Sequence, residues 1–127
     1  NLNVSTVSVT SSLTYISANS VTVGSSEINS ISIITSTTSD QIIDGFANTD
    51  WRSAHYHVTM NAGTDYHTTQ ISLVHDGINS YMTEYGTISS SNNLGTFSSV
   101  VISGSVKLNV IPTFANTTIR MFRTCNK

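Results

Sequence analysis

The stretch AHYHVTM (residues 54–60), followed by NAGTD (61–65) and YHTTQISLVH (66–75), contains the pattern that decides the fold. In both longer runs apolar and polar side chains alternate, which is the period of a strand with one buried face. The Gly-containing link between them is typical of a β-hairpin loop. With residues 61–65 as the loop, Thr59 is expected to face His67, and His57 to face Thr69.

Turn signals on the C-terminal side of this hairpin predict further short strands. Asp76-Gly77 favours a tight type I′ turn after residues 66–75, because Asp and Gly tolerate the positive φ that this turn requires. Ser103-Gly104 predicts a similar turn between residues 97–102 and 106–111. Several short strands at about ten-residue spacing predict an all-β fold, an antiparallel β-sandwich of the jelly-roll or Ig-like kind.

One segment departs from the strand pattern. Residues 39–47 favour a turn or a short helical piece, with Asp40 as its cap and with Ile42, Ile43 and Phe46 directed inward.

The N-terminal part differs in composition from the rest. Its first 45 residues carry no Lys or Arg, and a loose repeat runs through TVSV (6–9), SVTV (20–23) and SISI (30–33). Such a segment is either a set of strands of the same sandwich or an extended arm that pairs with a neighbouring subunit. We divide the chain into a strand-rich arm or stem (1–35) and a β-sandwich domain (36–127). The predicted interface residues are Val7, Val9, Val21, Val23, Ile31 and Ile33.

Composition excludes several classes of function. Charged residues make up 9% of the 127 residues and the net charge is −2, so no basic surface for nucleic acid is expected. No apolar stretch approaches the roughly 20 residues of a membrane span. Cys125, the single cysteine, excludes an internal disulfide, while Ser and Thr account for 41 residues.

No motif of catalysis or cofactor binding is present. The chain has no Gly-X-Ser-X-Gly elbow and no phosphate-binding glycine loop, so we expect neither an enzyme nor a cofactor. His55 and His57 share one face of a predicted strand, and a cross-strand His could complete a zinc site. We favour the simpler interpretation, in which the histidines are surface or interface groups hydrogen-bonded to hydroxyls, and we predict no metal.

The aromatic residues suggest a secondary hypothesis. Most are expected to pack in the core or at a subunit interface, but an exposed ring beside polar groups can also stack on a sugar. Trp51, beside Asp50, and Tyr81 are the candidate glycan contacts.

An ordered set of short blocks resembles a known family. The blocks are TSDQIIDGF (38–46), WRSA (51–54), VHDG (74–77), TEYGT (83–87), LGTF (94–97), VKL (106–108), IPT (111–113) and RT (123–124). Together they resemble a β-rich module of structural proteins from marine T4-like tailed phages, notably those of cyanobacteria. The resemblance covers about three quarters of the chain and leaves out the first 30 residues.

The resemblance implies a non-enzymatic virion protein, either an exterior capsid decoration or a subunit of a fibre or appendage. Its expected partners are copies of itself and other virion proteins, and assembly is expected through strand faces and arm exchange. The alternative function is a carbohydrate-binding host-adhesion module that contacts a host surface glycan.

Overall fold

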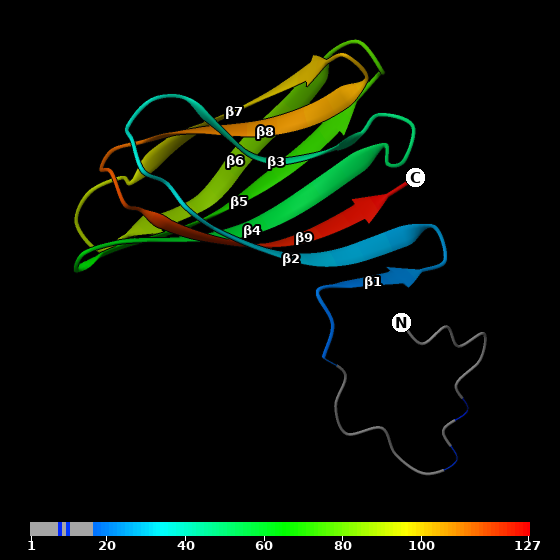
Figure 1. Cartoon of the computed structure of the whole chain (residues 1–127), viewed down its shortest axis with the longest axis horizontal. Helices are drawn as coiled ribbons and strands as arrows, with labels where there is room; N and C mark the ends of the chain where they lie inside the picture. The colour runs from blue at the N-terminus through cyan, green and yellow to red at the C-terminus, as the bar shows by residue number, and fades with distance from the viewer. Residues whose placement is uncertain (1–7, 9, 11–16) are drawn as a thin grey trace.

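The computed structural model describes residues 17–127 together with residues 8 and 10, and these form an antiparallel β-sandwich (Figure 1). The predicted all-β fold class is therefore confirmed. Nine strands follow one another along the described chain: β1 (Ser20–Val23), β2 (Ser26–Ile34), β3 (Gln41–Ala47), β4 (Ser53–Ala62), β5 (Asp65–His75), β6 (Ser80–Ser89), β7 (Gly95–Ile102), β8 (Ser105–Pro112) and β9 (Thr118–Asn126).

The two layers of the sandwich differ in width. The larger sheet has six strands in the order β1-β2-β9-β4-β5-β6, and the smaller sheet has three in the order β3-β8-β7. In Figure 1 the smaller sheet lies over β9, β4, β5 and β6, whereas β1 and β2 extend the larger sheet to one side. Every strand pairing is antiparallel.

The core lies between the two sheets and is built by the alternation seen in the sequence. Val58, Met60 and Ile71 point inward from the larger sheet, Leu108 and Val110 point inward from the smaller one, and each is at most 1% exposed. Burial of such side chains stabilises the fold by roughly 1.5–3 kcal/mol each. The other face of the larger sheet is open, and we call it the open face.

The central hairpin forms, but its register differs from the prediction. The loop is shorter than residues 61–65, because Ala62 pairs with Asp65 and only Gly63 and Thr64 remain in the turn. Met60 therefore faces His67, and Thr59 faces Thr68. A shift of one residue moves a side chain to the opposite face of a sheet, so His67 enters the core, where it is 1% exposed.

The two predicted turns have different outcomes. Ser103 and Gly104 both have positive φ and connect the paired residues Ile102 and Ser105, as predicted. The Asp76-Gly77 prediction of a two-residue turn is wrong. The loop extends over 76–79, because the Asp76 carboxylate accepts hydrogen bonds from the Ile78 and Asn79 amides at 2.8 and 2.7 Å.

The helical prediction for residues 39–47 is also wrong, since residues 41–47 form β3. The strand has an irregular register between Ile42 and Asp44, which indicates a bulge. This extra residue allows Ile43 and Phe46, three positions apart, both to face the core. Ile42 is instead 52% exposed, and Asp40 accepts hydrogen bonds from Asn109 rather than capping a helix.

Residues 20–34 of the predicted arm form β1 and β2, and β2 pairs along its length with β9. This part follows the first of the two interpretations, in which the N-terminal strands belong to the same sandwich. The predicted division at residue 35 falls between β2 and β3. The division itself stays a prediction, because residues 1–7, 9 and 11–16 lie outside the described part. In residues 17–127, no helix of the length and apolarity required to cross a membrane is found.

Candidate functional site

The open face carries a row of aromatic, imidazole and hydroxyl groups. Strand alternation directs Ser53 and His55 of β4 to this face, together with Ser72 of β5 and Tyr81 and Thr83 of β6. Neighbouring side chains that point inward from these strands, such as Ala54 and Leu73, are core residues. The sequence pattern that fills the core thus also gathers polar groups from three adjacent strands on one surface.

A shallow groove of about 500 Å³ crosses this part of the open face. Small-molecule sites usually measure about 300–1,000 Å³, so the groove is large enough for a ligand. It is lined by Ser53, Ala54, His55, Ser72, Leu73, Val74, Tyr81, Met82, Thr83 and Asn126.

Two tyrosine rings beside the groove are held by their hydroxyl groups. The Tyr81 hydroxyl donates to Asp76 Oδ2 at 3.1 Å, and the Tyr85 hydroxyl lies 2.9 Å from Nε2 of His55. Amide donors from Asn79 and Ile78 lower the pKa of Asp76 to about 2. The hydrogen bond to this carboxylate raises the pKa of Tyr81. Asp76 is therefore ionised at neutral pH and anchors the Tyr81 ring.

The two candidate glycan contacts do not form one site. Tyr81 is 55% exposed at the groove, whereas Trp51 is partly buried and packs against the core. The Lys127 ammonium lies 5.9 Å from the centre of the Trp51 ring. Trp51 lines a separate hollow of about 130 Å³ with Asp50 and Lys127. Contact of either ring with a glycan stays a prediction.

The predicted interface residues fall into three groups. Val21 and Val23 lie on β1 at the edge of the larger sheet and are 37% and 61% exposed. Ile31 and Ile33 of β2 are partly buried against the core of their own chain. Val7 and Val9 lie outside the described residues. Their role between subunits stays a prediction. Exposed apolar side chains coincide with a sheet edge at β1, and they do so at β6 as well.

The four histidines divide between the two faces of the larger sheet. His55 and His57 lie on the open face beside the Tyr85 and Thr68 hydroxyl groups, at 2.9 and 3.3 Å. His67 and His75 are buried, so the expectation that all four are surface or interface groups is wrong for these two. The register shift directs His67 inward. Residues 17–127 hold no group of three or more His, Cys, Asp or Glu side chains placed to bind a metal.

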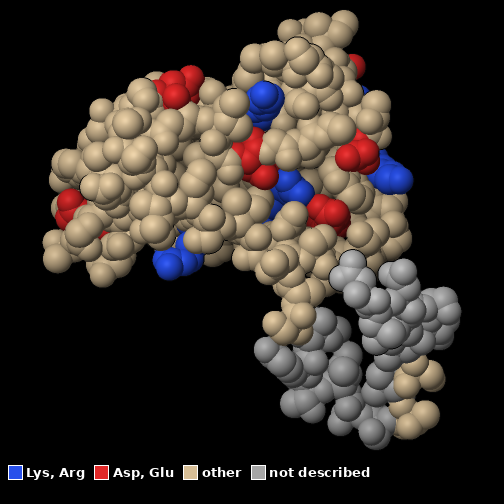
Figure 2. Space-filling view, in the orientation of Figure 1, with Lys and Arg blue, Asp and Glu red and all other residues tan. Residues whose placement is uncertain are grey.

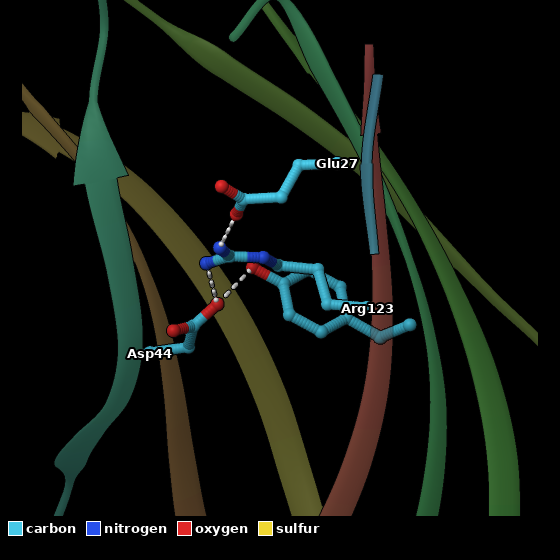
Figure 3. Close-up of polar contacts among 4 residues, drawn as sticks. Glu27, Asp44 and Arg123 are labelled. Atoms are coloured by element: carbon cyan, nitrogen blue, oxygen red, sulfur yellow. Dashed lines mark hydrogen bonds and ion pairs between the residues drawn. The ribbon is translucent and has the colours of Figure 1, made fainter. Parts of the chain in front are cut away.

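A buried ionic cluster connects the two sheets and was missed in the sequence (Figure 3). The Arg123 guanidinium donates to Asp44 Oδ2 at 2.7 Å and to Glu27 Oε1 at 2.9 Å. The Tyr56 hydroxyl donates to the same Asp44 oxygen at 2.7 Å. Burial, and next the negative charge of Asp44, raise the pKa of Tyr56. The guanidinium and the Tyr56 hydroxyl provide hydrogen bonds to both carboxylates within the sandwich, so this cluster is structural.

Comparison with solved structures finds this fold in a phage tailspike protein. The tailspike protein of Acinetobacter phage vB_ApiP_P1 matches 99% of the chain with a TM-score of 0.58 and 14% identity, and the match covers 25% of that tailspike. The tailspike gp49 of Acinetobacter baumannii bacteriophage Fri1, a capsular polysaccharide depolymerase, matches 80% of the chain with a TM-score of 0.49 and 13% identity, over 18% of its own length. No family model and no curated protein matches the chain significantly.

At these identities the likeness concerns the fold. This chain spans about a quarter of the length of the phage vB_ApiP_P1 tailspike. The two similar structures named above come from Acinetobacter phages, and the narrower resemblance to a module of T4-like cyanophages stays a prediction.

Proposed function

We propose that this chain is a non-enzymatic structural module of a phage tail appendage, exposed on the exterior of the virion as part of a tailspike or fibre. The observation that carries the proposal is the likeness of fold over 99% of the chain to a phage tailspike protein. Because one fold can serve unrelated functions, the proposal also rests on the surface and on the sheet edge.

The surface of the sandwich has the chemistry of a protein that lies against copies of itself. Figure 2 shows acidic and basic residues as a few scattered spots on a surface that is otherwise uncharged. Only 9% of the residues are charged. Charged groups are depleted at the centre of protein interfaces, so a hydroxyl-rich surface of this kind supports self-association.

Strand β1 supplies the edge at which copies could join. Within the described residues β1 pairs with β2 on one side, and its other side has no strand partner. All four residues of β1 are exposed, among them Val21 and Val23. An unpaired edge is a template for strand addition. We therefore place the arm exchange between subunits at β1, in a symmetric homo-oligomer of three or more copies.

The experiment that tests assembly is a mass measurement by light scattering after size-exclusion chromatography. The chain of 13.7 kDa is expected to elute as a trimer or larger oligomer. The double substitution V21K/V23K adds two charges to the edge and should give a folded monomer. The matched control is Ile88→Lys, which changes a 70%-exposed residue on β6, the strand at the opposite edge, and should leave the oligomer intact.

A monomeric wild-type chain overturns the assembly proposal, and so does an unchanged oligomer in V21K/V23K. Loss of the oligomer in both V21K/V23K and Ile88→Lys would assign the effect to charge in general rather than to β1. Circular dichroism confirms that each variant keeps its strands.

Two further measurements test the rest of the proposal. An antibody against the chain should label the tail of purified particles in electron microscopy, and label on the head would instead favour a capsid decoration. A reducing-end assay on capsular polysaccharide should detect no cleavage by the purified chain. Cleavage above background would overturn the non-enzymatic role.

A further inference from the structure

The groove on the open face is left unused by the proposed assembly through β1. We propose that it is a binding site for a neutral oligosaccharide, with the Tyr81 ring as the stacking platform and with hydroxyl groups of β4, β5 and β6 as hydrogen-bonding partners. The groove lies within one chain, so this inference stands whether or not the chain assembles.

The polar lining matches the chemistry of a sugar. Ser53, Ser72 and Thr83 come from three neighbouring strands and each carries a hydroxyl that can both donate and accept. Asn126 adds an amide at one end of the groove. Sugar hydroxyl groups also both donate and accept, so a row of such partners can satisfy them without any charged group. A purely apolar ligand would leave these groups without partners, at a cost of about 1–3 kcal/mol each.

Tyr81 provides a flat apolar surface in a fixed place. Its side chain is 55% exposed, yet its hydroxyl is tied to Asp76 in the 76–79 loop at 3.1 Å. The adjacent outward-facing Tyr85 is 44% exposed and is tied to His55. A ring that is already ordered loses little conformational entropy when a ligand stacks on it. Val74, paired with Tyr81 across the strands, widens the apolar floor.

Charge selects a neutral ligand over an acidic one. No Lys, Arg, Asp or Glu lines the groove. Two cations adjoin groove residues in the sequence, since Arg52 precedes Ser53 and Lys127 follows Asn126, but both line the separate hollow at Trp51. The ionised Asp76 lies at the hydroxyl of Tyr81 and would repel a sugar acid. A uronic, sialic or sulfated sugar therefore finds no cation in the groove lining and meets a carboxylate beside the Tyr81 ring.

The test is binding of the wild-type chain to a glycan array, followed by titration calorimetry at pH 7.5. The array holds glucan, mannan, galactan and N-acetylhexosamine oligomers of four to six units beside oligogalacturonate, oligosialate and a heparin hexasaccharide. Wild type should bind at least one neutral oligomer and none of the acidic ones. Tyr81→Ala should weaken the neutral binding about tenfold or more, because it removes the stacking surface. Tyr81→Phe keeps the ring and should stay within about threefold of wild type.

The matched control is Tyr66→Ala. Tyr66 is 57% exposed on β5 near the opposite end of the strand and does not line the groove, so this variant should bind as wild type does. The inference is overturned by an array without neutral binding, by acidic oligomers that bind as tightly as neutral ones, or by equal losses in Tyr81→Ala and Tyr66→Ala. Because both substitutions are at exposed positions, thermal unfolding should show that both variants remain folded.

Discussion

Arg123 Nη1 donates to Asp44 Oδ2 at 2.7 Å, and this contact joins β9 of the larger sheet to β3 of the smaller one. The residues are 79 positions apart in the chain. Their side chains are 6% and 10% exposed, so water screens the pair weakly. The contact links the two sheets at the side where the larger sheet is wider than the smaller one.

The substitution Asp44→Asn should destabilise the fold by about 3 kcal/mol, because it leaves a buried guanidinium without one of its two carboxylates. Denaturant unfolding followed by circular dichroism measures the change. Asp50→Asn, at an exposed position, is the control and should lie within about 0.5 kcal/mol of wild type. A change below about 1 kcal/mol in Asp44→Asn would mean that the pair contributes little.

His67 should make the fold sensitive to mild acid. Its Nδ1 accepts the Leu94 amide hydrogen at 3.0 Å, and its Nε2 is buried without a hydrogen-bond partner among the described residues. Burial lowers the pKa of His67 from 6.5. The unfolded chain then binds more protons, so the contribution of His67 is complete above pH 6.5 and decreases as the pH falls below it.

Unfolding in urea at pH 7.5, 6.5, 5.5 and 5.0 tests this prediction. Wild type should lose stability by up to about 1.4 kcal/mol per pH unit below 6.5, and His67→Gln should show a smaller slope. His57→Gln, which changes an exposed histidine, should keep the wild-type slope. Equal slopes in wild type and His67→Gln would assign the acid sensitivity to other groups.

Gly95 is required because its place on β7 has no room for a side chain. A Cβ atom there would lie 2.9 Å from both the Met60 Cε and the Val110 Cγ2. The tip of Met60 can move, whereas the branched Val110 is stiff. Gly95→Ala should therefore cost about 1–3 kcal/mol.

A double-substitution cycle with Val110→Ala separates overpacking from other causes of this loss. Val110→Ala removes the methyl group that the new Cβ would strike, so the G95A/V110A chain should be more stable than the sum of the two single losses predicts. Additive losses would show that the cost of Gly95→Ala comes from elsewhere.

Cys125 should be unreactive in the folded chain. Its side chain is 0% exposed, and burial raises the pKa of its thiol to about 11. Thiol reagents attack the thiolate, so labelling by a maleimide at pH 7.5 should be at least about a hundredfold slower than in 8 M urea, roughly the ratio of thiolate expected from the pKa difference. Rapid labelling under native conditions would indicate that the β9 end opens locally.

Alternation in the sequence predicted the strands and the sandwich, because it shows which side chains share a face. It could not show how many residues each turn contains. Gly63 has a φ of +60°, and the turn that it forms is tighter than the five residues its neighbours suggested. That single difference placed His67 on the face of the sheet opposite to Thr59 rather than beside it.

The bulge in β3 shows a second limit of pattern analysis. Ile43 and Phe46 are three residues apart, which is also the spacing of one face of a helix. They share a face of a strand because β3 pairs with β8 through a bulge of one extra residue. Arg123, in contrast, could have been found. It occupies an inward position between Met121 and Cys125 on β9, and a charge at such a position requires a buried partner. The sequence could not identify that partner, because Asp44 lies on another sheet.

The sequence did not predict a groove. Tyr81, one of the two candidate glycan contacts, lies at the groove in the structure. Trp51, the other candidate, packs against the core instead. Whether an aromatic ring is exposed depends on which strands cover it, and this coverage follows from the order of strands in the two sheets.

The unequal widths of the two sheets also determine where the molecule opens first. The larger sheet has six strands and the smaller sheet three, so β1 lies beyond the core and all four of its residues are exposed (Figure 1). Local opening is easiest where few apolar groups are buried. Amide hydrogens of β1 should therefore exchange with solvent before those of β4 and β5. Strand β1 can thus fray and re-form while the packed half of the sandwich stays intact, which would let the chain exchange its outer strand without unfolding.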